Sequence, residues 1–127
     1  HITVNLDAPR FSRVLMNIIS NSIKYASKAR DGKLTITLTG YDKSVIIALE
    51  DNGIGISDKN ISHIFETFYR ADQARTRVSN GSGIGLAVCK EIVEQHGGHI
   101  WATSNEGKNT TILISLNKVI KEVNNDD

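Results

Sequence analysis

Hydrophobic residues recur at helical spacing in two parts of the chain. Between residues 11 and 26 the apolar side chains fall on one arc when each position advances by ~100°. Asp7 and Pro9 stand just before this arc, where an N-cap residue and a first-turn proline are favoured. Residues 83–96 form a second amphipathic pattern, and Gly97-Gly98 supplies the C′ glycine that ends a helix. We therefore expect two amphipathic helices.

Shorter apolar runs, most of them alternating with polar residues, predict strands. They lie at residues 2–6, 34–39, 44–50, 99–103 and 110–116. The alternating run 34–39 is expected to be half buried. The run 44–50 is expected to be more fully buried, because most of its side chains are apolar. Turn residues at 40–43 and 105–108 link neighbouring runs into hairpins.

The segments between these runs complete the fold prediction. Ser57 could cap a short helix that reaches Ile64, and residues 71–82 hold almost no large apolar side chain, which is typical of a mobile loop or lid. The order of elements predicts an α+β fold: a two-layer sandwich in which helices cover one face of a mixed, mostly antiparallel sheet. One domain is expected at residues 1–117, followed by a polar tail at residues 118–127.

Composition narrows the class of protein. The chain has 127 residues and a mass of 13.9 kDa, which suits one domain with one core. Fifteen basic residues nearly balance fourteen acidic ones, so a nucleic acid is not an expected partner. The single cysteine, Cys89, lies among apolar residues and indicates a buried thiol in a reducing compartment, the cytoplasm. No apolar run approaches the roughly 20 residues that cross a bilayer, so this segment is not expected to be membrane-embedded.

A polar stripe borders the apolar face of the first predicted helix. Asn17, Asn21 and Lys24 are spaced four and three residues apart, so they share one side of the helix. The carboxamide oxygens can join phosphate oxygens and water around Mg²⁺ without adding charge, and the lysine ammonium can reach a phosphate. Ordinary solvent-exposed side chains would give the same pattern, so the stripe alone leaves both interpretations open.

Two glycine-rich loops follow the stripe. Asp51 ends a predicted strand and precedes Gly53 and Gly55, so its carboxylate could accept a hydrogen bond from an exocyclic amine such as that of adenine. An ordinary Asx turn would use the same residues. The glycines of residues 81–85 open a helix whose free N–H groups favour a phosphate. Arginines near this loop, Arg70 among them, could reach a terminal phosphate or serve only solubility.

In this order the motifs resemble those of the Bergerat-fold ATP-binding superfamily and, within it, those of sensor histidine kinases. Residues 17–25 resemble the N box, residues 51–55 the G1 box, residues 65–70 the F box and residues 81–86 the G2 box. The closing run 93–101 is also typical of that family. The resemblance spans residues 2–117 and implies the Bergerat ATP-binding fold, with ATP and Mg²⁺ as ligands.

The resemblance also implies roles for individual residues. Asn21 would hold Mg²⁺ and Asn17 would assist with the metal and the phosphates, so that these two and Lys24 would be the catalytic residues. Asp51 would bind the adenine amine. The nucleotide site as a whole would comprise Asn17, Asn21, Lys24, Tyr25, Asp51, Gly53, Gly55, Ile56, Phe68, Arg70, Gly81, Ser82, Gly83, Ile84, Gly85 and Leu86.

Asn17 bears on the type of reaction. Hydrolytic branches of the superfamily carry a glutamate one turn before the metal-binding asparagine, and an asparagine cannot act as a general base there. Attack by water should therefore be poor, and the γ-phosphate is expected to pass to a histidine. The expected function is that of the ATP-binding catalytic domain of a two-component sensor histidine kinase.

The implied partners are the dimerisation and histidine-phosphotransfer domain of a parent kinase and a response regulator. None of the four histidines of this chain lies in the sequence context of the family's phosphoacceptor, so no autophosphorylation is expected of this chain alone. The parent is expected to be a membrane-bound sensor kinase with this part in the cytoplasm. A serine kinase of the anti-sigma-factor type and a regulatory nucleotide-binding module of the same fold remain as alternatives.

Overall fold

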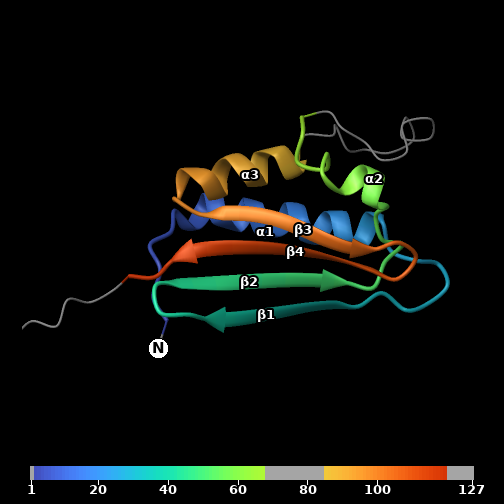
Figure 1. Ribbon diagram of the computed structural model, residues 1–127, viewed down its shortest axis with the longest axis horizontal. Coiled ribbons are helices and arrows are strands. Elements are labelled where there is room, and N and C mark those ends of the chain that lie inside the picture. Colours follow the sequence, from blue (N-terminus) through green and yellow to red (C-terminus); the bar gives the residue numbers. More distant parts are fainter. Residues whose placement is uncertain (1, 68–84, 120–127) are drawn as a thin grey trace, which may run out of the picture.

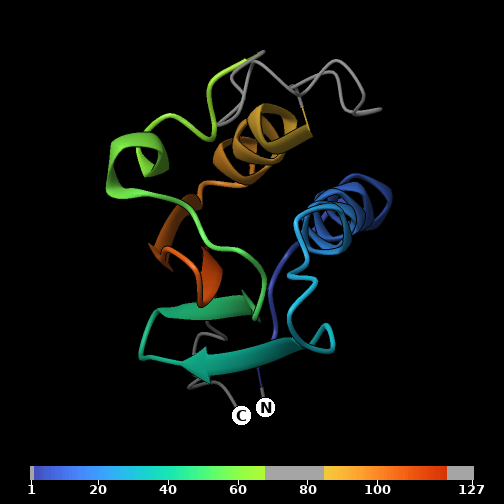
Figure 2. The ribbon, with the colours of Figure 1, turned by 90° about the vertical axis from the view of Figure 1, so that its right-hand side faces the viewer.

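The computed structural model describes residues 2–67 and 85–119 as a sheet with helices on one face (Figures 1 and 2). The elements are α1 (Ala8–Lys24), β1 (Leu34–Gly40), β2 (Ser44–Asp51), α2 (Asp58–Ile61), α3 (Gly85–Gln95), β3 (His99–Asn105) and β4 (Asn109–Asn117). The sheet has four strands in the order β1-β2-β4-β3. The expected α+β sandwich is confirmed. The parallel component of the expected mixed sheet does not occur among the described strands, because each neighbouring pair is antiparallel.

The strand expected at residues 2–6 is not formed. This segment makes one isolated antiparallel bridge, between Val4 and Lys118, and Thr3 O accepts a hydrogen bond from Val119 N at 2.7 Å. The physical reason is the short distance along the chain to α1, which begins at Ala8, so the backbone leaves the sheet after a single bridge. The polar tail expected from residue 118 onward therefore starts with two residues that contact the fold, and its boundary stays a prediction.

The two long helices begin and end near the predicted signals. In α1, Asp7 is the N-cap, its side chain accepts a hydrogen bond from Arg10 N at 3.2 Å, and Pro9 lies in the first turn. The helix ends at Lys24, two residues before the predicted end. Helix α3 ends at Gln95, and Gly97 follows with φ of 75°, the left-handed conformation expected of a C′ glycine. The short helix α2 follows Ser57 but ends at Ile61, three residues before the predicted end.

The core lies between the helices and β2 and β4. Val14 and Ile18 of α1, Val93 of α3, and Leu49 and Ile114 of the sheet are all nearly inaccessible to solvent. Burial of this cluster stabilises the fold by roughly 25 cal/mol per Å² of apolar surface removed from water.

The expected half burial of residues 34–39 is wrong. In the strand register Ile36 is opposite Leu49 and Leu38 is opposite Ile47, so both lie on the helix-facing side, yet they are 56% and 57% exposed. The apolar alternation of β1 places its side chains on the correct face, but the helices do not extend over this edge strand.

His96 joins the start of α1 to the end of α3. Its Nδ1 donates to Ile92 O at 2.7 Å, which leaves Nε2 to accept a hydrogen bond from Asp7 N at 3.0 Å. The imidazole also packs against the Phe11 ring in a T-shaped arrangement, with 6.0 Å between ring centroids. The residue expected at the helix C-terminus thus also fixes the N-terminal end of α1.

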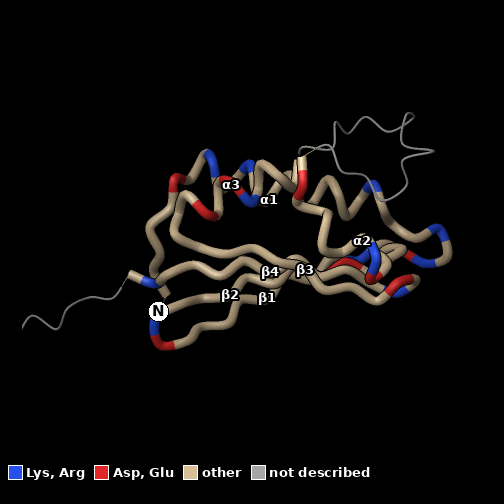
Figure 3. The backbone as a smooth tube through the Cα atoms, turned by 45° about the horizontal axis from the view of Figure 1, so that its top comes forward, with Lys and Arg blue, Asp and Glu red and all other residues tan. Residues whose placement is uncertain are grey.

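Acidic and basic residues interleave along the described backbone (Figure 3). This mixture agrees with the formal net charge of +1. None of the helices in the described ranges is long and apolar enough to span a membrane.

Gly98 provides a test of the packing between the end of α3 and β4. A Cβ at this position would lie 2.3 Å from Ser115 O and 3.2 Å from Val93 Cγ1, so Gly98→Ala should lower the free energy of unfolding by about 1–3 kcal/mol. Gly32→Ala is the matched control, since a Cβ there meets nothing within 4 Å. Urea unfolding followed by circular dichroism measures both, and equal stabilities of the two variants would contradict the packing described.

Candidate nucleotide site

The C-terminal end of α1 contacts the loop that follows β2. Tyr25 O accepts a hydrogen bond from Ile54 N at 3.0 Å. A Cβ on Gly53 would lie only 2.5 Å from the same carbonyl oxygen, so this approach requires glycine. The contact brings the end of the asparagine stripe, which consists of Asn17, Asn21 and Lys24, next to the loop of Asp51. Asp51 lies about 26 residues after Tyr25 in the sequence.

The same helix contacts the start of α3. Asn17 Nδ2 donates to Gly85 O at 3.2 Å, and the buried thiol of Cys89 on α3 donates to Val14 O of α1 at 3.5 Å. Leu86, the next residue of α3, packs against the core. One face of α1 therefore lies against the first turn of the helix that the second glycine loop opens.

Asp51 is held in position by its own loop. It is half buried, and its Oδ1 accepts a hydrogen bond from Gly53 N at 2.9 Å. The side chain of Asn52 bonds Lys33 N at 2.8 Å and Asp31 O at 2.8 Å, which ties the loop to the segment before β1. The Asx turn is therefore present, and it orients the carboxylate expected to bind adenine.

The backbone at the second glycine of this loop is fixed by the β3–β4 turn. Gly55 has φ of 74°, and a Cβ there would lie 2.4 Å from Asn105 O. Ile54 O accepts a hydrogen bond from Gly107 N at 2.6 Å, and Ile56 N donates to Ser104 Oγ at 2.7 Å. The glycines expected to let a ligand approach closely therefore also leave the space that the protein's own backbone occupies.

Two polar residues beside Asp51 were missed from the sequence. Thr110 is opposite Asp51 in the strand register, and Ser104 is opposite Thr110, so the three share one row of the helix-facing side. Thr110 is only 7% exposed, and its hydroxyl lies 3.0 Å from Ser104 Oγ. The signal that marks Thr110 is its pairing with Asp51 across two strands. The sequence alone does not give the register of those strands.

Arg30 was also missed, because its sequence context marks only a helix exit. Its guanidinium donates hydrogen bonds to backbone carbonyls of the loop after β2 and of the β3–β4 turn. Nothing in the spacing of Arg30 from the motifs indicates these contacts.

Asn21, Lys24 and Tyr25 occupy the last turn and the cap of α1. Lys24 Nζ lies 5.4 Å from the centroid of the Tyr25 ring, a cation–π distance. Within residues 2–67 and 85–119, no hydrogen bond engages the half-buried Asn21 carboxamide, which leaves its oxygen available to a ligand. In the same ranges no three His, Cys, Asp or Glu side chains converge on a possible metal site.

Several predicted site residues lie outside the described residues. They are Phe68, Arg70, Gly81, Ser82, Gly83 and Ile84. The loop expected to act as a lid, residues 71–82, lies there too. Of the segment resembling an F box, the structure describes Phe65, Glu66 and Thr67, and the ring of Phe65 packs against the core.

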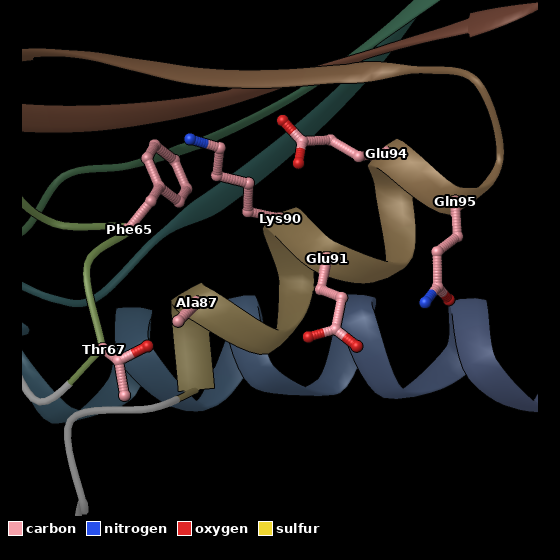
Figure 4. Close-up of a pocket in the computed structure, with 7 residues that line it drawn as sticks. All are labelled: Phe65, Thr67, Ala87, Lys90, Glu91, Glu94 and Gln95. Atoms are coloured by element: carbon pink, nitrogen blue, oxygen red, sulfur yellow. The ribbon is translucent and has the colours of Figure 1, made fainter.

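A separate hollow lies against the outer side of α3 (Figure 4). It has a volume of about 450 Å³ and is wide open to solvent, and residues of α3 such as Lys90, Glu91 and Glu94 line it together with Phe65 and Thr67. None of the predicted nucleotide-site residues within residues 2–67 and 85–119 lines this hollow.

The fold and the sequence motifs together define a class of protein, and comparison with known sequences identifies that class. Residues 6–120 match the family described as "Histidine kinase-, DNA gyrase B-, and HSP90-like ATPase", and the chain belongs to that family.

Individual relatives are sensor kinases. The chain is 44% identical to "Sensor histidine kinase WalK" of Bacillus subtilis (strain 168) over 124 residues, which are 98% of this chain and 20% of that protein. It is 41% identical over 115 residues to "Sensor protein kinase WalK" of Staphylococcus haemolyticus, covering 91% of this chain and 19% of the relative. The chain thus spans about a fifth of the length of the curated relatives it matches.

Solved structures agree with this assignment. The mycobacterial sensor histidine kinase MprB superposes with a TM-score of 0.79 at 28% identity, covering 93% of this chain and 78% of that one. The catalytic domain of the histidine kinase ThkA superposes with a TM-score of 0.74 at 27% identity, covering 91% and 71%. The resemblance to sensor histidine kinases is confirmed, and this chain is homologous to their catalytic ATPase domains.

The buried thiol of Cys89 should make the stability of the domain sensitive to alkaline pH. Burial raises the pKa of this thiol from 9.0 to about 11, against smaller opposing effects of the Asn17 hydrogen bond and the Arg13 charge. Between these values the thiol ionises in the unfolded chain but keeps its proton in the folded one. The free energy of unfolding should therefore fall as pH rises through this window.

Urea unfolding at pH values below and within the window tests this expectation. The Cys89→Ala variant should lose less stability over the same interval, because it has no thiol to ionise. Equal losses in the two proteins would assign the pH dependence to other groups.

Proposed function

We propose that this chain binds Mg-ATP and donates the γ-phosphate to a histidine on a separate dimerisation domain of a parent sensor kinase. The observation that carries the proposal is the position of α1, whose C-cap residue Tyr25 contacts the Asp51 loop and whose Asn17 contacts the start of α3. Membership of an ATPase family and similarity to sensor kinases support it.

Asp51 is the proposed adenine-binding residue. One oxygen of its carboxylate accepts from Gly53 N, so the other oxygen can accept a hydrogen bond from the exocyclic amine of the base. Guanine presents a carbonyl oxygen at the corresponding position, and two acceptors facing one another repel. The carboxylate therefore favours ATP over GTP.

The asparagines suit a metal that arrives with the nucleotide. Mg²⁺ keeps several water ligands and needs only one or two protein oxygens when phosphates supply the rest. The Asn21 carboxamide provides one neutral oxygen, and the described residues form no carboxylate cluster that would hold the metal alone. These residues fit Mg-ATP, and the bound metal would neutralise charge on the phosphates.

The protein's own contribution to transfer is positioning. Asn17 has no basic group that could take a proton from water, and its Nδ2 already donates a hydrogen bond to Gly85 O. It therefore does not activate water. Lys24 adds positive charge near the phosphate side, and the first turn of α3 presents N–H groups there. The site is therefore suited to holding the γ-phosphate for an incoming nucleophile.

The further partners follow from this proposal. The phosphoacceptor histidine lies on a dimerisation and phosphotransfer domain of the parent, and a response regulator receives the phosphate afterwards. The parent is a membrane-bound sensor with this domain in the cytoplasm.

Calorimetric titration with ATP and GTP, with and without Mg²⁺, tests the site. Asn21→Ala should weaken Mg-ATP binding by about tenfold, the loss of one charge-assisted contact, and should reduce the benefit of Mg²⁺. Asp51→Asn replaces an acceptor with a group that can donate, so the preference for ATP over GTP should fall. Unchanged affinities and unchanged preference in both variants would show that the site is wrongly assigned.

Phosphate transfer distinguishes the proposed kinase from its alternatives. Incubated alone with radiolabelled ATP, this chain should gain no acid-labile phosphate, whereas adding a dimerisation domain with its histidine should give phosphohistidine on that domain. Acid-stable phosphoserine on a partner would favour a serine kinase, and ATP binding without transfer would favour a regulatory module.

A further inference from the structure

The guanidinium of Arg30 contacts carbonyl groups of two separate loops. Its Nε donates to Asn52 O at 2.7 Å, and its Nη2 lies 2.9 Å from Gly53 O. The same Nη2 lies 2.8 Å from Gly107 O and 3.3 Å from Lys108 O, so its two hydrogens are shared among three acceptors. A planar, permanently charged group with several N–H donors is suited to this arrangement.

These contacts join three segments at one end of the molecule. The segment after α1 carries Arg30, the loop after β2 carries Asn52 and Gly53, and the β3–β4 turn carries Gly107 and Lys108 (Figure 1). The loop and the turn also bond one another directly, through Gly107 N and Ile54 O. Arg30 therefore closes a junction in which each segment limits the position of the other two.

The junction bears directly on Asp51. Gly53 donates its N–H to Asp51 Oδ1 and accepts a hydrogen bond from Arg30 through its carbonyl oxygen. The two neighbouring peptide groups at Gly53 are thus both held, one by the carboxylate and one by the guanidinium. A shift of the Gly53 backbone would move the anchor that orients the carboxylate.

We propose that Arg30 is a positioning residue that determines adenine specificity by fixing the Gly53 backbone and, through it, the Asp51 carboxylate. The proposal rests on the proposed function, in which Asp51 binds the adenine amine. Arg30 itself does not touch the base. It acts on the orientation of the residue that does, so its loss weakens ATP binding more than GTP binding.

A purely structural role would have a different signature. Arg30 is exposed to solvent. If it only stabilised the fold, its replacement would lower the unfolding temperature and weaken the binding of both nucleotides by the same factor. Selectivity between ATP and GTP is therefore the informative quantity.

The experiment compares three variants of the 127-residue chain with the wild type. Arg30→Gln removes the charge and most of the donors, Arg30→Lys keeps the charge without the planar fork, and Lys28→Gln removes a charge from the same exposed segment. Calorimetry gives affinities for Mg-ATP and Mg-GTP, thermal unfolding gives stability, and hydrogen exchange gives the protection of the Ile54 and Gly107 amides.

In Arg30→Gln we expect ATP affinity to fall by about fivefold, roughly the net effect of one ordinary hydrogen bond, with a smaller change for GTP. Exchange at the Ile54 and Gly107 amides should accelerate. Arg30→Lys should lie between this variant and the wild type, and Lys28→Gln should match the wild type.

Three results would overturn the inference. Arg30→Gln could keep the wild-type preference for ATP while Asp51→Asn loses it, which would refute the role of Arg30 and leave the proposed function intact. Arg30→Gln could instead weaken ATP and GTP equally in step with its unfolding temperature, which would reduce Arg30 to a structural contact. A wild-type chain that does not bind ATP would refute the proposed function and the specificity role together.

Discussion

The last turn of α1 lies directly on the backbone of the loop after β2, and the geometry of the candidate site depends on this contact. Tyr25 O accepts from Ile54 N, and the approach leaves no space for a side chain on Gly53. Because α1 also carries Asn17, which bonds Gly85 O, the helix sets the separation between the loop expected to bind the base and the helix expected to face the phosphates. A rotation of α1 by one residue would break both contacts and turn the asparagine stripe away.

The helix itself is fixed at its opposite end and along its length. His96 bonds the N-cap backbone of α1, and Val14 and Ile18 are buried against the sheet and α3. The polar stripe therefore sits on an element whose orientation is determined by packing rather than by the stripe.

Much of the fold could be predicted from periodicity, because burial on one side of a helix or strand leaves a direct pattern in the residues. The bounds of α1 and β2 were close for this reason. Two expectations failed because they depend on neighbours distant in sequence. Alternation in β1 indicates which face Ile36 and Leu38 occupy, but it contains no information on whether a helix covers them. Residues 2–6 have strand-like alternation, but their pairing is limited by the immediate start of α1.

The candidate site divides in the same way. Asn17, Asn21 and Asp51 could be proposed from sequence because they lie in local motifs whose order along the chain resembles that of a known family, and their roles stay predictions. Arg30 and Thr110 could not, because their importance lies in contacts with segments that the strand register and the loop closure bring together.

Gly53 and Gly55 do not by themselves indicate a nucleotide site. The space beside Gly53 and Gly55 is filled by Tyr25 O and Asn105 O, so both glycines are needed for the loop to pack, whatever the site binds. A relative that had lost catalysis but kept the fold would keep them too. The glycines therefore establish the architecture, whereas the polar groups left available for a ligand carry the evidence for nucleotide chemistry. Those groups are the Asn21 carboxamide and the second oxygen of Asp51, and neither is required for the packing described.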